Sequence, residues 1–583
     1  MTAAPLVVPV ADHGVLVVFD DEISDETYAR IHALDAALTR NPPAGLAEIV
    51  PAMTTLLVVF DPLATDHIAI SAAVHDNLTA PSTISSGAAH VIDVCYDNEH
   101  APDLPALATR AGLDPEGAVA AHLAGTYAVG MYGFAPGYAY LYGTPSSIQQ
   151  PRNPTPGPVV PAGSVIIAGQ QCLIIPIAMS TGMVRHRPHR HVNVHRRSEQ
   201  AVSVRRRRPR HLPADRRGRP PVPPCRTAPR PAMSTAVLKV RRCGPLVTIQ
   251  DAGRPGLMRY GVPASGPMDR FAHAAAHVAL GRPRRGTAIE VSLGGLSVMC
   301  TSAPVTVSIC GGGFAVDHAG ERCTSWTVRT LVPGDTLTIS AGDWGSWCYL
   351  AVAGDLVSRR WLGSTSTHVR ADLGGGPVRT GDELRIESAQ VDDAREGPVE
   401  PPAIAQPARV LRVVLGPQPQ CFGPDAGEVL LGSPYALTAA YDRMGVRLAG
   451  ARLPIDDALA IASTPILRGS LQVTGDGAPT LLLADHQTTG GYPKIATVIA
   501  DDASRATQLR SGDTVRFVEL DPPAAIRAAR AAADVHAHHL AVVADRPGLR
   551  TRRLLSTNLI GGAFHHRQPC RPVGGDPSEN PSL

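Results

Sequence analysis

The spacing of apolar residues over the first part of the chain predicts a small α+β domain, residues 1–85. An apolar run at 14–19 has the length of a buried strand. The segment that starts at Ser24 combines capping residues with apolar side chains at helical spacing, which predicts a helix. β-rich runs at 49–61 and an amphipathic segment at 67–78 follow. The predicted order is therefore βαββα.

A different pattern begins at residue 91, where short β-branched runs alternate with Gly and Pro turns. One helical passage interrupts this pattern at 104–123. After the helical passage, the segment 133–141 interleaves turn residues with aromatic ones. This pattern is typical of a loop that displays rings beside a barrel mouth, or of a packed β-turn. We expect a β-barrel domain over residues 86–184.

Turn-and-strand units recur after Met233. The segments PGDTLTI, TGDELRI and SGDTVRF each place a Gly-Asp turn before an alternating strand. Repeated hairpins that close a barrel explain this pattern most simply, so we expect two similar barrel halves, 233–400 and 401–533. The chain as a whole is predicted to be mainly β, with an α+β domain at its N-terminus.

Two stretches fall outside these domains, residues 185–232 and the tail 534–583, to which we assign no function. Between Arg185 and Pro231 there are 15 Arg and nine Pro against two acidic residues, and almost no large aliphatic side chains. Such a composition cannot bury a core, so we predict that this junction is disordered. Because the whole chain carries +3, everything outside the stretch carries a net charge of −10.

The codons of the junction indicate how it arose. Reading residues 183–191 one base later permits Trp-Ser-Ala-Ile-Gly-Arg-Thr-Ala, an apolar continuation of the strand expected at 172–176. We therefore favour a frameshifted junction, with Met233 as the start of a second polypeptide. A genuine disordered linker and a nucleic-acid arm are the alternatives. The acidic remainder, without an aromatic and basic platform, favours no nucleic-acid partner.

Bulk composition excludes several classes of protein. With 583 residues, 44% hydrophobic and 18% charged, the chain suits about four globular domains. It has no run of about 18 apolar residues, and its first residues lack the pattern of a secretion signal, so we expect a cytoplasmic protein without membrane contact. The ten cysteines form no CxxC pair, which indicates neither a zinc site nor a disulfide framework. No metal ligands are predicted.

Four Gly-rich segments carry dense polar clusters: 250–256, 265–269, 441–445 and 484–494. Loops of this kind expose main-chain N–H groups and bring amides, carboxylates and guanidinium groups together. An adjacent Asp-Arg pair is also typical of a structural ion pair. Taken together, the clusters predict an anion-binding pocket, with its centre in the last two segments.

Lysine usage singles out one residue. Of the 54 basic Lys and Arg residues, only Lys239 and Lys494 are lysine, so Arg stands almost everywhere that a surface cation would serve. Arg has a planar donor fork and cannot shift its pKa, whereas Lys provides a compact ammonium. We therefore expect Lys494 to be required as a lysine, at the mouth of the barrel and followed by a strand over 495–499.

The same segments resemble a known pair of families. GFAPGYAYL and PAGSVIIAG are similar to the B subunit of 5-oxoprolinase, also called allophanate hydrolase subunit 1 or the sporulation-kinase inhibitor family, over about 8–182. QDAGRPG, GVPASGPMD, YDRMGVRL, GSLQVTGDG and LLADHQTTGGYPKIATVI resemble the C subunit, the biotin-dependent carboxyltransferase-like family, over about 236–520. The resemblance implies cyclophilin-like barrels, and it extends to the carboxyltransferase portion of urea amidolyase.

The resemblance implies ATP-coupled opening of the lactam 5-oxo-L-proline to L-glutamate, with a separate A subunit, and with the B-like and C-like parts in one complex. It implies ATP, with Mg²⁺, as cofactor and no biotin attached to this chain. Phosphoryl transfer to a lactam oxygen needs nearby cations and proton donors. We assign catalytic roles to Lys494, His486, Asp442 and Arg443. We assign substrate or nucleotide binding to Gln250, Asp251, Arg254, Ser265, Asp269, Gln472, Gln487, Tyr492, Phe134, Pro136 and Tyr138.

The chain departs from the resemblance in two respects. The B subunit should continue beyond residue 182 with a Trp, an Ile-Gly-Arg-Thr segment and a Gly-Asp hairpin, so its barrel is not expected to close here. No Walker-A sequence is present, so an ATP site must be of another kind. A carboxyltransferase acting on a separate carboxybiotin carrier, and a regulatory inhibitor of a histidine kinase, are the alternative functions.

Overall fold

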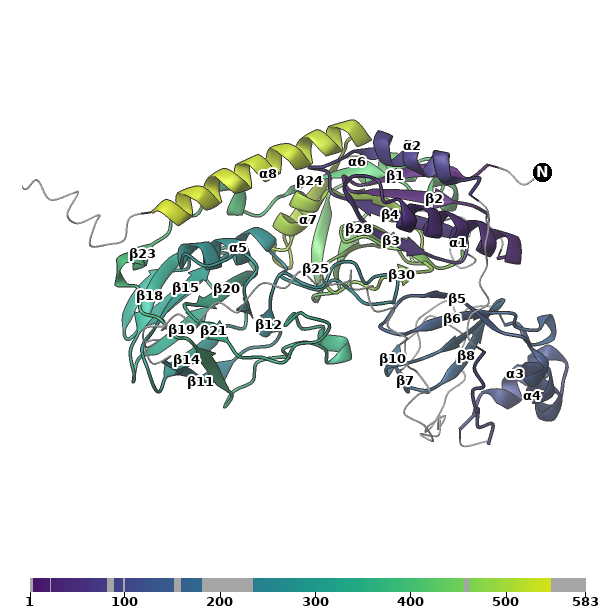
Figure 1. The fold of residues 1–583 in the computed structure, drawn as a ribbon, viewed down its shortest axis with the longest axis horizontal. Helices are drawn as coiled ribbons and strands as arrows, with labels where there is room; N and C mark the ends of the chain where they lie inside the picture. The colour runs from purple at the N-terminus through teal and green to yellow at the C-terminus, as the bar shows by residue number, and fades with distance from the viewer. Residues whose placement is uncertain are drawn as a thin grey trace, which may run out of the picture.

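The computed structural model describes residues 4–20, 23–80, 89–97, 100–150, 159–180, 234–455 and 461–546. The predicted junction 185–232 and the tail beyond residue 546 lie outside the described residues. Figure 1 shows an N-terminal sheet and a smaller sheet beside it, and a larger C-terminal part made of two β units. No helix among the described residues is long and apolar enough to cross a bilayer.

The N-terminal unit is an antiparallel sheet in the order β1-β2-β4-β3, with two helices on one face. Its elements are β1 (Leu6–Val10), β2 (Gly14–Val18), α1 (Asp25–Arg40), β3 (Leu46–Pro51), β4 (Thr55–Phe60) and α2 (His67–Asn77). The predicted cap of α1 is confirmed, since Ser24 Oγ accepts a hydrogen bond of 3.1 Å from the Thr27 N–H. Strand β1 was not predicted, because Pro9 interrupts its apolar run. The sheet tolerates Pro9 because β1 is an edge strand.

The second unit contains an open four-stranded sheet in the order β5-β6-β9-β8 and a separate pair, β10 and β7. Its elements are α3 (Leu104–Ala111), α4 (Pro115–Ala124), β5 (Ala128–Tyr132), β6 (Ala139–Tyr142), η1 (Ser146–Ile148), β7 (Val159–Val160), β8 (Val165–Ala168), β9 (Gln171–Ile174) and β10 (Met179–Ser180). The helical passage expected at 104–123 is two helices, because Gly112 at φ +69° ends the first. The described strands of this unit do not form a closed barrel.

The third unit consists of two sheets that face each other across an apolar core. Their orders are β17-β16-β19-β14-β11-β22-β21 and β12-β13-β20-β15-β18-β23, and α5 covers the second sheet. The elements are β11 (Ala236–Cys243), β12 (Thr248–Gln250), α5 (Arg270–Ala279), β13 (Ala288–Ser292), β14 (Leu296–Cys300), β15 (Val305–Cys310), β16 (Ala315–His318), β17 (Glu321–Thr324), β18 (Thr327–Leu331), β19 (Thr336–Ser340), β20 (Trp347–Val352), β21 (Asp355–Leu356), η2 (Val369–Ala371), β22 (Glu383–Glu387), η3 (Asp393–Arg395), β23 (Gly397–Pro398) and η4 (Ala403–Ala405).

The fourth unit is a closed barrel, β24-β31-β28-β29-β26-β25-β32. It closes because β24 pairs with β31 on one side and, in parallel, with β32 on the other. No such pairing joins the two sheets of the third unit among the described residues, so the two expected halves differ in closure. The elements are β24 (Val410–Leu415), η5 (Pro419–Cys421), α6 (Ala426–Gly432), β25 (Tyr435–Tyr441), β26 (Gly445–Gly450), β27 (Thr464–Pro465), β28 (Ser470–Val473), β29 (Pro479–Leu482), β30 (Thr489–Gly490), β31 (Lys494–Val498), α7 (Ala500–Ala506), β32 (Thr514–Glu519) and α8 (Pro522–Asp545).

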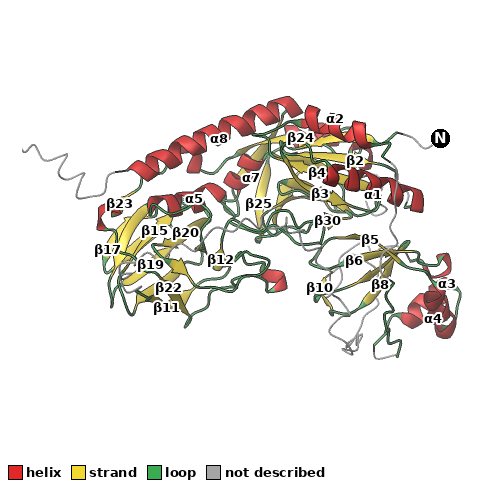
Figure 2. Cartoon of the chain, viewed as in Figure 1, coloured by secondary structure: helices red, strands yellow, loops and turns green. Residues whose placement is uncertain are grey.

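The three Gly-Asp segments adopt the predicted local structure. Gly334, Gly381 and Gly512 have φ values of +98°, +97° and +92°, a conformation that favours glycine. Each is followed within two residues by the start of a strand, β19, β22 or β32. The repeat therefore marks three equivalent turns. Two of them lead into strands of the same seven-stranded sheet, β19 and β22 (Figure 2), and the third leads into β32 of the closed barrel.

Helix α8 connects distant parts of the chain, and the predicted boundary at residue 533 falls inside it. Near its start, Ile526 packs in the core of the N-terminal unit, and Arg530 Nε donates to Pro62 O at 2.9 Å. Near its end, Leu540 and Val543 pack in the core that contains α5. In Figure 1 the helix runs from α2 at one end to the region of β23 at the other. Residues 534–546 are thus part of the packed structure.

Two adjacent valines of α8 test this role. We expect Val543→Ser, which changes a side chain 4% exposed, to lower the free energy of unfolding by about 1–3 kcal/mol. Val542→Ser is the matched control, because Val542 is 53% exposed and has the same helical context. Chemical denaturation followed by tryptophan fluorescence measures both. Equal shifts for the two variants would contradict the packing of α8 against this core.

Candidate functional site

The N-terminal and C-terminal parts meet along one face of the first sheet. Val10 and Leu16 from this sheet share a core with Met258 and Leu467 of the C-terminal part. Beside this core, Gly256 N–H and Met258 N–H donate to the Glu48 carboxylate. The B-like and C-like parts therefore form one packed body.

The loop of the GFAPGY motif also packs on the C-terminal part. Tyr132 forms a parallel bridge with Tyr260, and the Gly137 N–H donates to Tyr260 O at 3.1 Å. A Cβ atom at Gly133 would overlap the side chain of Thr489, so only glycine allows this approach. Two motifs recognised separately in the sequence, GFAPGYAYL and HQTTGGYPK, thus lie in contact.

The aromatic residues of this loop are largely packed, as the second of the two interpretations of the segment expects. Tyr138 is 1% exposed and belongs to the core of the second unit. Phe134 is half-buried at φ +64°, and its ring centroid lies 5.5 Å from that of Tyr138. Pro136 is half-buried. The packed-turn interpretation therefore fits Tyr138, and the contact with Thr489 is made through Gly133.

Lys494 is the first residue of β31, and its side chain is 2% exposed. Its Nζ donates to Thr464 Oγ1 at 2.5 Å, and its main-chain N–H donates to Gln418 Oε1 at 3.0 Å. Burial lowers the pKa of Lys494 to about 7. The predicted strand is confirmed with a shift of one residue. The amine, however, lies inside the barrel wall rather than exposed at the mouth.

Strand pairing brings the Lys494 partner next to the glycine pair, because Thr464 of β27 faces Gly490 of β30. A Cβ at Gly490 would lie 3.0 Å from Gln472 Nε2. Gln487 Nε2 donates to Gln472 Oε1 at 3.0 Å, and Gln472 Nε2 donates to Tyr492 O at 3.3 Å. Two primary amides, a hydroxyl and an amine therefore surround the Thr489–Gly490 segment.

Thr488 and Thr489 adjoin these groups in the chain, and we include them in what we call the Lys494 cluster: Thr464, Gln472, Gln487, Thr488, Thr489 and Lys494. The buried hydroxyls of Thr488 and Thr489 have no hydrogen-bond partner in the described part of the chain. Buried polar atoms are normally satisfied, so unsatisfied ones are places where a ligand or water binds. His486 directly precedes Gln487 of this cluster. Its Nδ1 donates to Gln487 O at 2.7 Å, and burial lowers the pKa of His486 to about 4. His486 is therefore a neutral imidazole near pH 7.

Arg443 belongs to a second cluster and is 2% exposed. Its Nε donates to Asp485 Oδ2 at 2.9 Å, its Nη1 donates to the Glu290 carboxylate, and its Nη2 donates to Gly266 O at 2.7 Å. Although burial alone would lower it, the two carboxylates raise the pKa of Arg443. The structural ion-pair interpretation fits Arg443, but its partners come from β13 and the 485–494 segment rather than from Asp442.

Asp442 does not join either cluster. Its side chain is exposed, and Oδ1 accepts hydrogen bonds from the N–H groups of Met444 and Gly445 at 2.8 and 3.2 Å. This is an Asx turn that shapes the hairpin between β25 and β26. The structure therefore provides no support for the predicted proton-transfer role of Asp442, and we do not carry it into the proposed site.

Three more predicted binding residues are buried in the C-terminal part. Asp269 caps α5, accepting from Ala272 N–H at 2.9 Å, and it also accepts from Gln508 Nε2 at 2.8 Å. Gln250 Nε2 donates to Thr248 Oγ1 at 2.9 Å. Ser265, at φ +52°, is 4% exposed. Asp269 and Gln250 therefore have structural partners of their own.

Asp251 accepts four hydrogen bonds. The donors are Ser364 Oγ at 2.6 Å, Ser366 Oγ at 2.7 Å, Thr365 N–H at 2.7 Å and Gly253 N–H at 2.9 Å. Burial alone would raise its pKa, but these donors hold the pKa of Asp251 below the ordinary value. A carboxylate satisfied in this way fixes the 364–366 segment and is not free to bind a ligand.

Sequence reasoning missed Thr464, Gln418 and Glu290. Thr464 and Gln418 are single polar residues outside any motif, so the sequence carries no signal for them. Glu290 did have one, because it is an acidic residue inside the apolar run AIEVS. Buried carboxylates in strands need a counter-charge, so this residue pointed to a buried cation.

The buried amine leads to a prediction about stability and pH. Because the pKa of Lys494 is about 7 when folded and 10.5 ordinarily, the unfolded chain binds the proton more strongly, and stability rises with pH across this window. Lys494→Met removes the penalty, so we expect its Tm to exceed that of the wild type at pH 7 and below. The corresponding difference in the free energy of unfolding is on the order of a few kcal/mol at neutral pH and should shrink toward pH 10.5.

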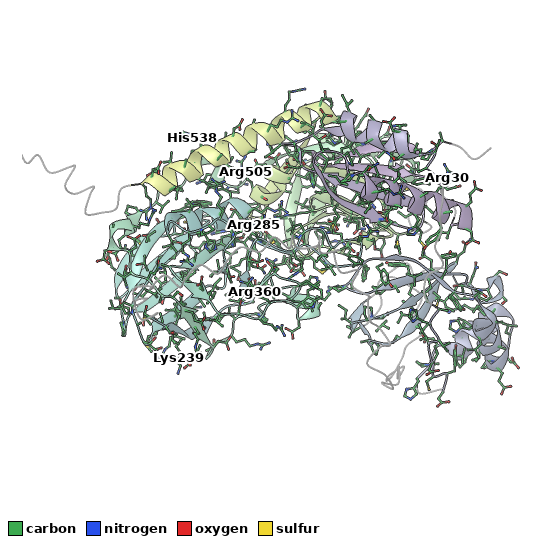
Figure 3. The ribbon with its side chains drawn as sticks, in the orientation of Figure 1. Arg30, Lys239, Arg285, Arg360, Arg505 and His538 are labelled. Atoms are coloured by element: carbon green, nitrogen blue, oxygen red, sulfur yellow. The ribbon has the colours of Figure 1, made fainter. Side chains whose placement is uncertain are left out.

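Differential scanning calorimetry from about pH 6 to about pH 10 measures this effect, since the window spans both pKa values. Lys239→Met is the matched control, since Lys239, which is labelled in Figure 3, lies half-buried on β11. A Tm difference for Lys494→Met that does not change with pH would show that Lys494 is charged throughout and would contradict the lowered pKa.

Family models match both parts of the chain. The model of the carboxyltransferase domain, subdomains C and D, matches residues 5–184, and that of subdomains A and B matches residues 260–519. The chain is 33% identical to the C subunit of 5-oxoprolinase from Haemophilus influenzae over 285 residues, covering 48% of this chain and 91% of that protein. It is 31% identical to the B subunit of 5-oxoprolinase from Bacillus subtilis over 194 residues, covering 31% of this chain and 81% of that protein.

Two other similarities concern the arrangement of the parts. Urea amidolyase of Saccharomyces cerevisiae is 27% identical over 339 residues, which are 54% of this chain and 18% of that enzyme. The crystal structure of the protein TTHA0988 superposes with a TM-score of 0.70 at 29% identity, covering 87% of this chain and 99% of that one. A single polypeptide with both parts in this arrangement thus exists in another protein. The chain belongs to the carboxyltransferase-domain family of the 5-oxoprolinase B and C subunits, with subdomains C and D in its N-terminal part and subdomains A and B in its C-terminal part.

Proposed function

We propose that this chain is the combined B and C portion of an ATP-dependent 5-oxoprolinase, which converts 5-oxo-L-proline to L-glutamate together with a separate A subunit. One observation carries the proposal. Regions that match most of the B subunit, and most of the C subunit, lie on one chain, and their motif loops meet at Gly133 and Thr489 beside the Lys494 cluster. The partner is expected because the relatives are named as subunits.

The Lys494 cluster suits chemistry on a lactam. A lactam is a poor electrophile, and phosphorylation of its amide oxygen by ATP activates the ring carbon for attack by water. Cleavage of the C–N bond then opens the ring, releases the amine and leaves an acyl phosphate. A second water hydrolyses this acyl phosphate to the γ-carboxylate of glutamate and inorganic phosphate. The side-chain amides of Gln472 and Gln487 can hydrogen-bond both the N–H and the C=O of a cyclic amide. The Lys494 ammonium, surrounded by protein rather than water, can neutralise negative charge that develops on the oxygen or the phosphoryl group.

ATP is the phosphoryl donor in this proposal, and Mg²⁺ accompanies it. The dependence on ATP is also the reason to expect a cytoplasmic location. No step requires biotin on this chain. The Lys494 side chain is 2% exposed, so its ammonium acts in a setting of low dielectric, where an electrostatic contact to the reacting group is stronger than in water.

Turnover of 5-oxoproline tests the proposal directly. The full chain is incubated with 5-oxoproline, with and without the purified A subunit, and with and without MgATP, and glutamate and ADP are quantified. We expect glutamate only in the mixture that holds the chain, MgATP and the A subunit. Absence of glutamate from this complete mixture, with a folded chain, would overturn the proposal.

A second candidate follows from the family models and the fungal relatives. In this alternative the chain transfers a carboxyl group from carboxybiotin on a separate carrier to a urea-like amide, as a component similar to that of urea amidolyase. Incubation with carboxybiotin and urea distinguishes the two, because the alternative predicts free biotin and carboxylated urea in equal amounts. Our proposal predicts neither.

A further inference from the structure

Arg254 is a buried cation whose donors are only partly used. The residue is 4% exposed, and its main-chain N–H donates to Ala264 O at 2.8 Å. Its Nη2 donates to Ser366 O, whereas Nε and Nη1 have no hydrogen-bond partner. Among the described residues, no other arginine has two buried side-chain nitrogens without a hydrogen-bond partner. Leaving charged donors unpaired inside a protein is costly, so such an arrangement calls for a ligand.

The nearby carboxylates do not satisfy Arg254. Asp251 interacts with it electrostatically, but the oxygens of Asp251 accept four other hydrogen bonds. Asp485 also lies within electrostatic range, but its oxygens accept hydrogen bonds from Arg443. Arg254 forms no ion pair among the described residues. The two carboxylates are already hydrogen-bonded to other donors, so the Nε and Nη1 donors of Arg254 remain available for a ligand.

The surroundings of Arg254 are built to present the guanidinium. Its Cζ lies 5.4 Å from the centroid of the Trp361 ring, a cation–π contact that orients the plane. Beside it, Gly374 at φ +80° has no side chain, and a Cβ there would lie 3.1 Å from Arg254 Nη2. The buried ring of His368 interacts electrostatically with the same guanidinium. Its Nδ1 accepts from Ala371 N–H at 3.2 Å, which leaves Nε2 as the proton-bearing donor.

We propose that Arg254 binds an oxyanion of one of the ligands in the proposed reaction, either the carboxylate of 5-oxoproline or a phosphate of ATP. The inference rests on the proposed function for the identity of the ligands, but not for the presence of an anion site. Guanidinium groups match carboxylate and phosphate oxygens better than any other side chain does. Asp485, which interacts with Arg254, begins the segment that ends at Lys494, so the 485–494 segment connects the anion site to the Lys494 cluster.

Kinetics with Arg254 variants tests the inference and identifies the anion. In the full chain with the A subunit, Arg254→Gln is expected to raise one KM by about tenfold to a hundredfold, the scale of one charge-assisted hydrogen-bonded contact. A rise in the KM for 5-oxoproline, with unchanged kinetics for 2-pyrrolidinone, which lacks the carboxylate, assigns Arg254 to the substrate. A rise in the KM for ATP assigns it to a phosphate. Arg254→Lys should restore part of the affinity.

The matched control is Arg360→Gln, which removes the same charge from an exposed residue adjacent to Trp361 (Figure 3). If both KM values of a folded Arg254→Gln protein stay within about twofold of the control, Arg254 binds only water and the inference is wrong. If the wild type itself has no turnover, the proposed function fails instead. Calorimetric titration with inorganic phosphate and with acetate then tests the site alone. Binding by the wild type but not by Arg254→Gln supports it, and equal results contradict it.

Discussion

Lys494→Ala is expected to lower the turnover of 5-oxoproline by about 10²–10³-fold, the effect of removing one preorganised electrostatic donor from an enzyme site. The amine is 2% exposed, and its hydrogen-bond partner in the structure is Thr464 Oγ1. The side chain thus keeps its charge available for a ligand. Because the ammonium is the form that neutralises negative charge, the turnover that depends on Lys494 should fall as pH rises through about 7, the pKa of the buried amine. Steady-state kinetics with MgATP and the A subunit measures both effects.

Two further variants separate chemistry from folding. Lys494→Arg should also lose activity, because the guanidinium is larger and directs its donors differently. Lys239→Ala, which changes the only other lysine in the chain, should retain full turnover. Near wild-type turnover by a folded Lys494→Ala protein would exclude Lys494 from the mechanism. It would also remove the centre of the proposed site.

Arg443→Met is expected to lower the free energy of unfolding by about 3–5 kcal/mol, the largest effect on stability that we predict. The substitution leaves the carboxylates of Glu290 and Asp485 buried, at 0% and 2% exposure, without their common counter-charge. Glu290 lies on β13 and Asp485 follows β29, so the loss weakens the contact between the third and fourth units. Chemical denaturation near neutral pH measures the change.

The control for Arg443 is a cation on the same hairpin. Arg447 lies on β26 and pairs with Asp476 at the surface, where its side chain is 39% exposed. Arg447→Met should therefore cost no more than about 1 kcal/mol. Similar losses for the two variants would show that the Arg443 cluster is solvated and contributes little. A larger loss for Arg443→Met, with 5-oxoproline affinity retained, supports a structural role.

Much of the local structure follows from the sequence because it depends on neighbouring residues. The capped helix at Ser24 and the turns at Gly334, Gly381 and Gly512 are set by local hydrogen bonds and backbone freedom, and all are confirmed. The motifs also identified the B and C subunit families of 5-oxoprolinase, because they consist of the residues that shape each loop. Lys494 was singled out by usage alone. Strand β1 was missed because proline is tolerated in a strand at the edge of a sheet, and the sequence does not show which strand lies at the edge.

The site itself was decided by tertiary structure. Asp442 and Arg443 are neighbours in sequence, yet the turn between β25 and β26 places one in solvent and the other inside an ion cluster with Glu290, 153 positions away. Likewise, no spacing rule could bring Thr464 to Lys494 Nζ or Gly133 to Thr489, because these contacts depend on how a barrel closes and how two parts pack. The sequence by itself determined the elements, the turns and the family. Long-range packing determined which polar residues are satisfied and which, like Arg254, keep their donors free, because burial and pairing are properties of the folded whole.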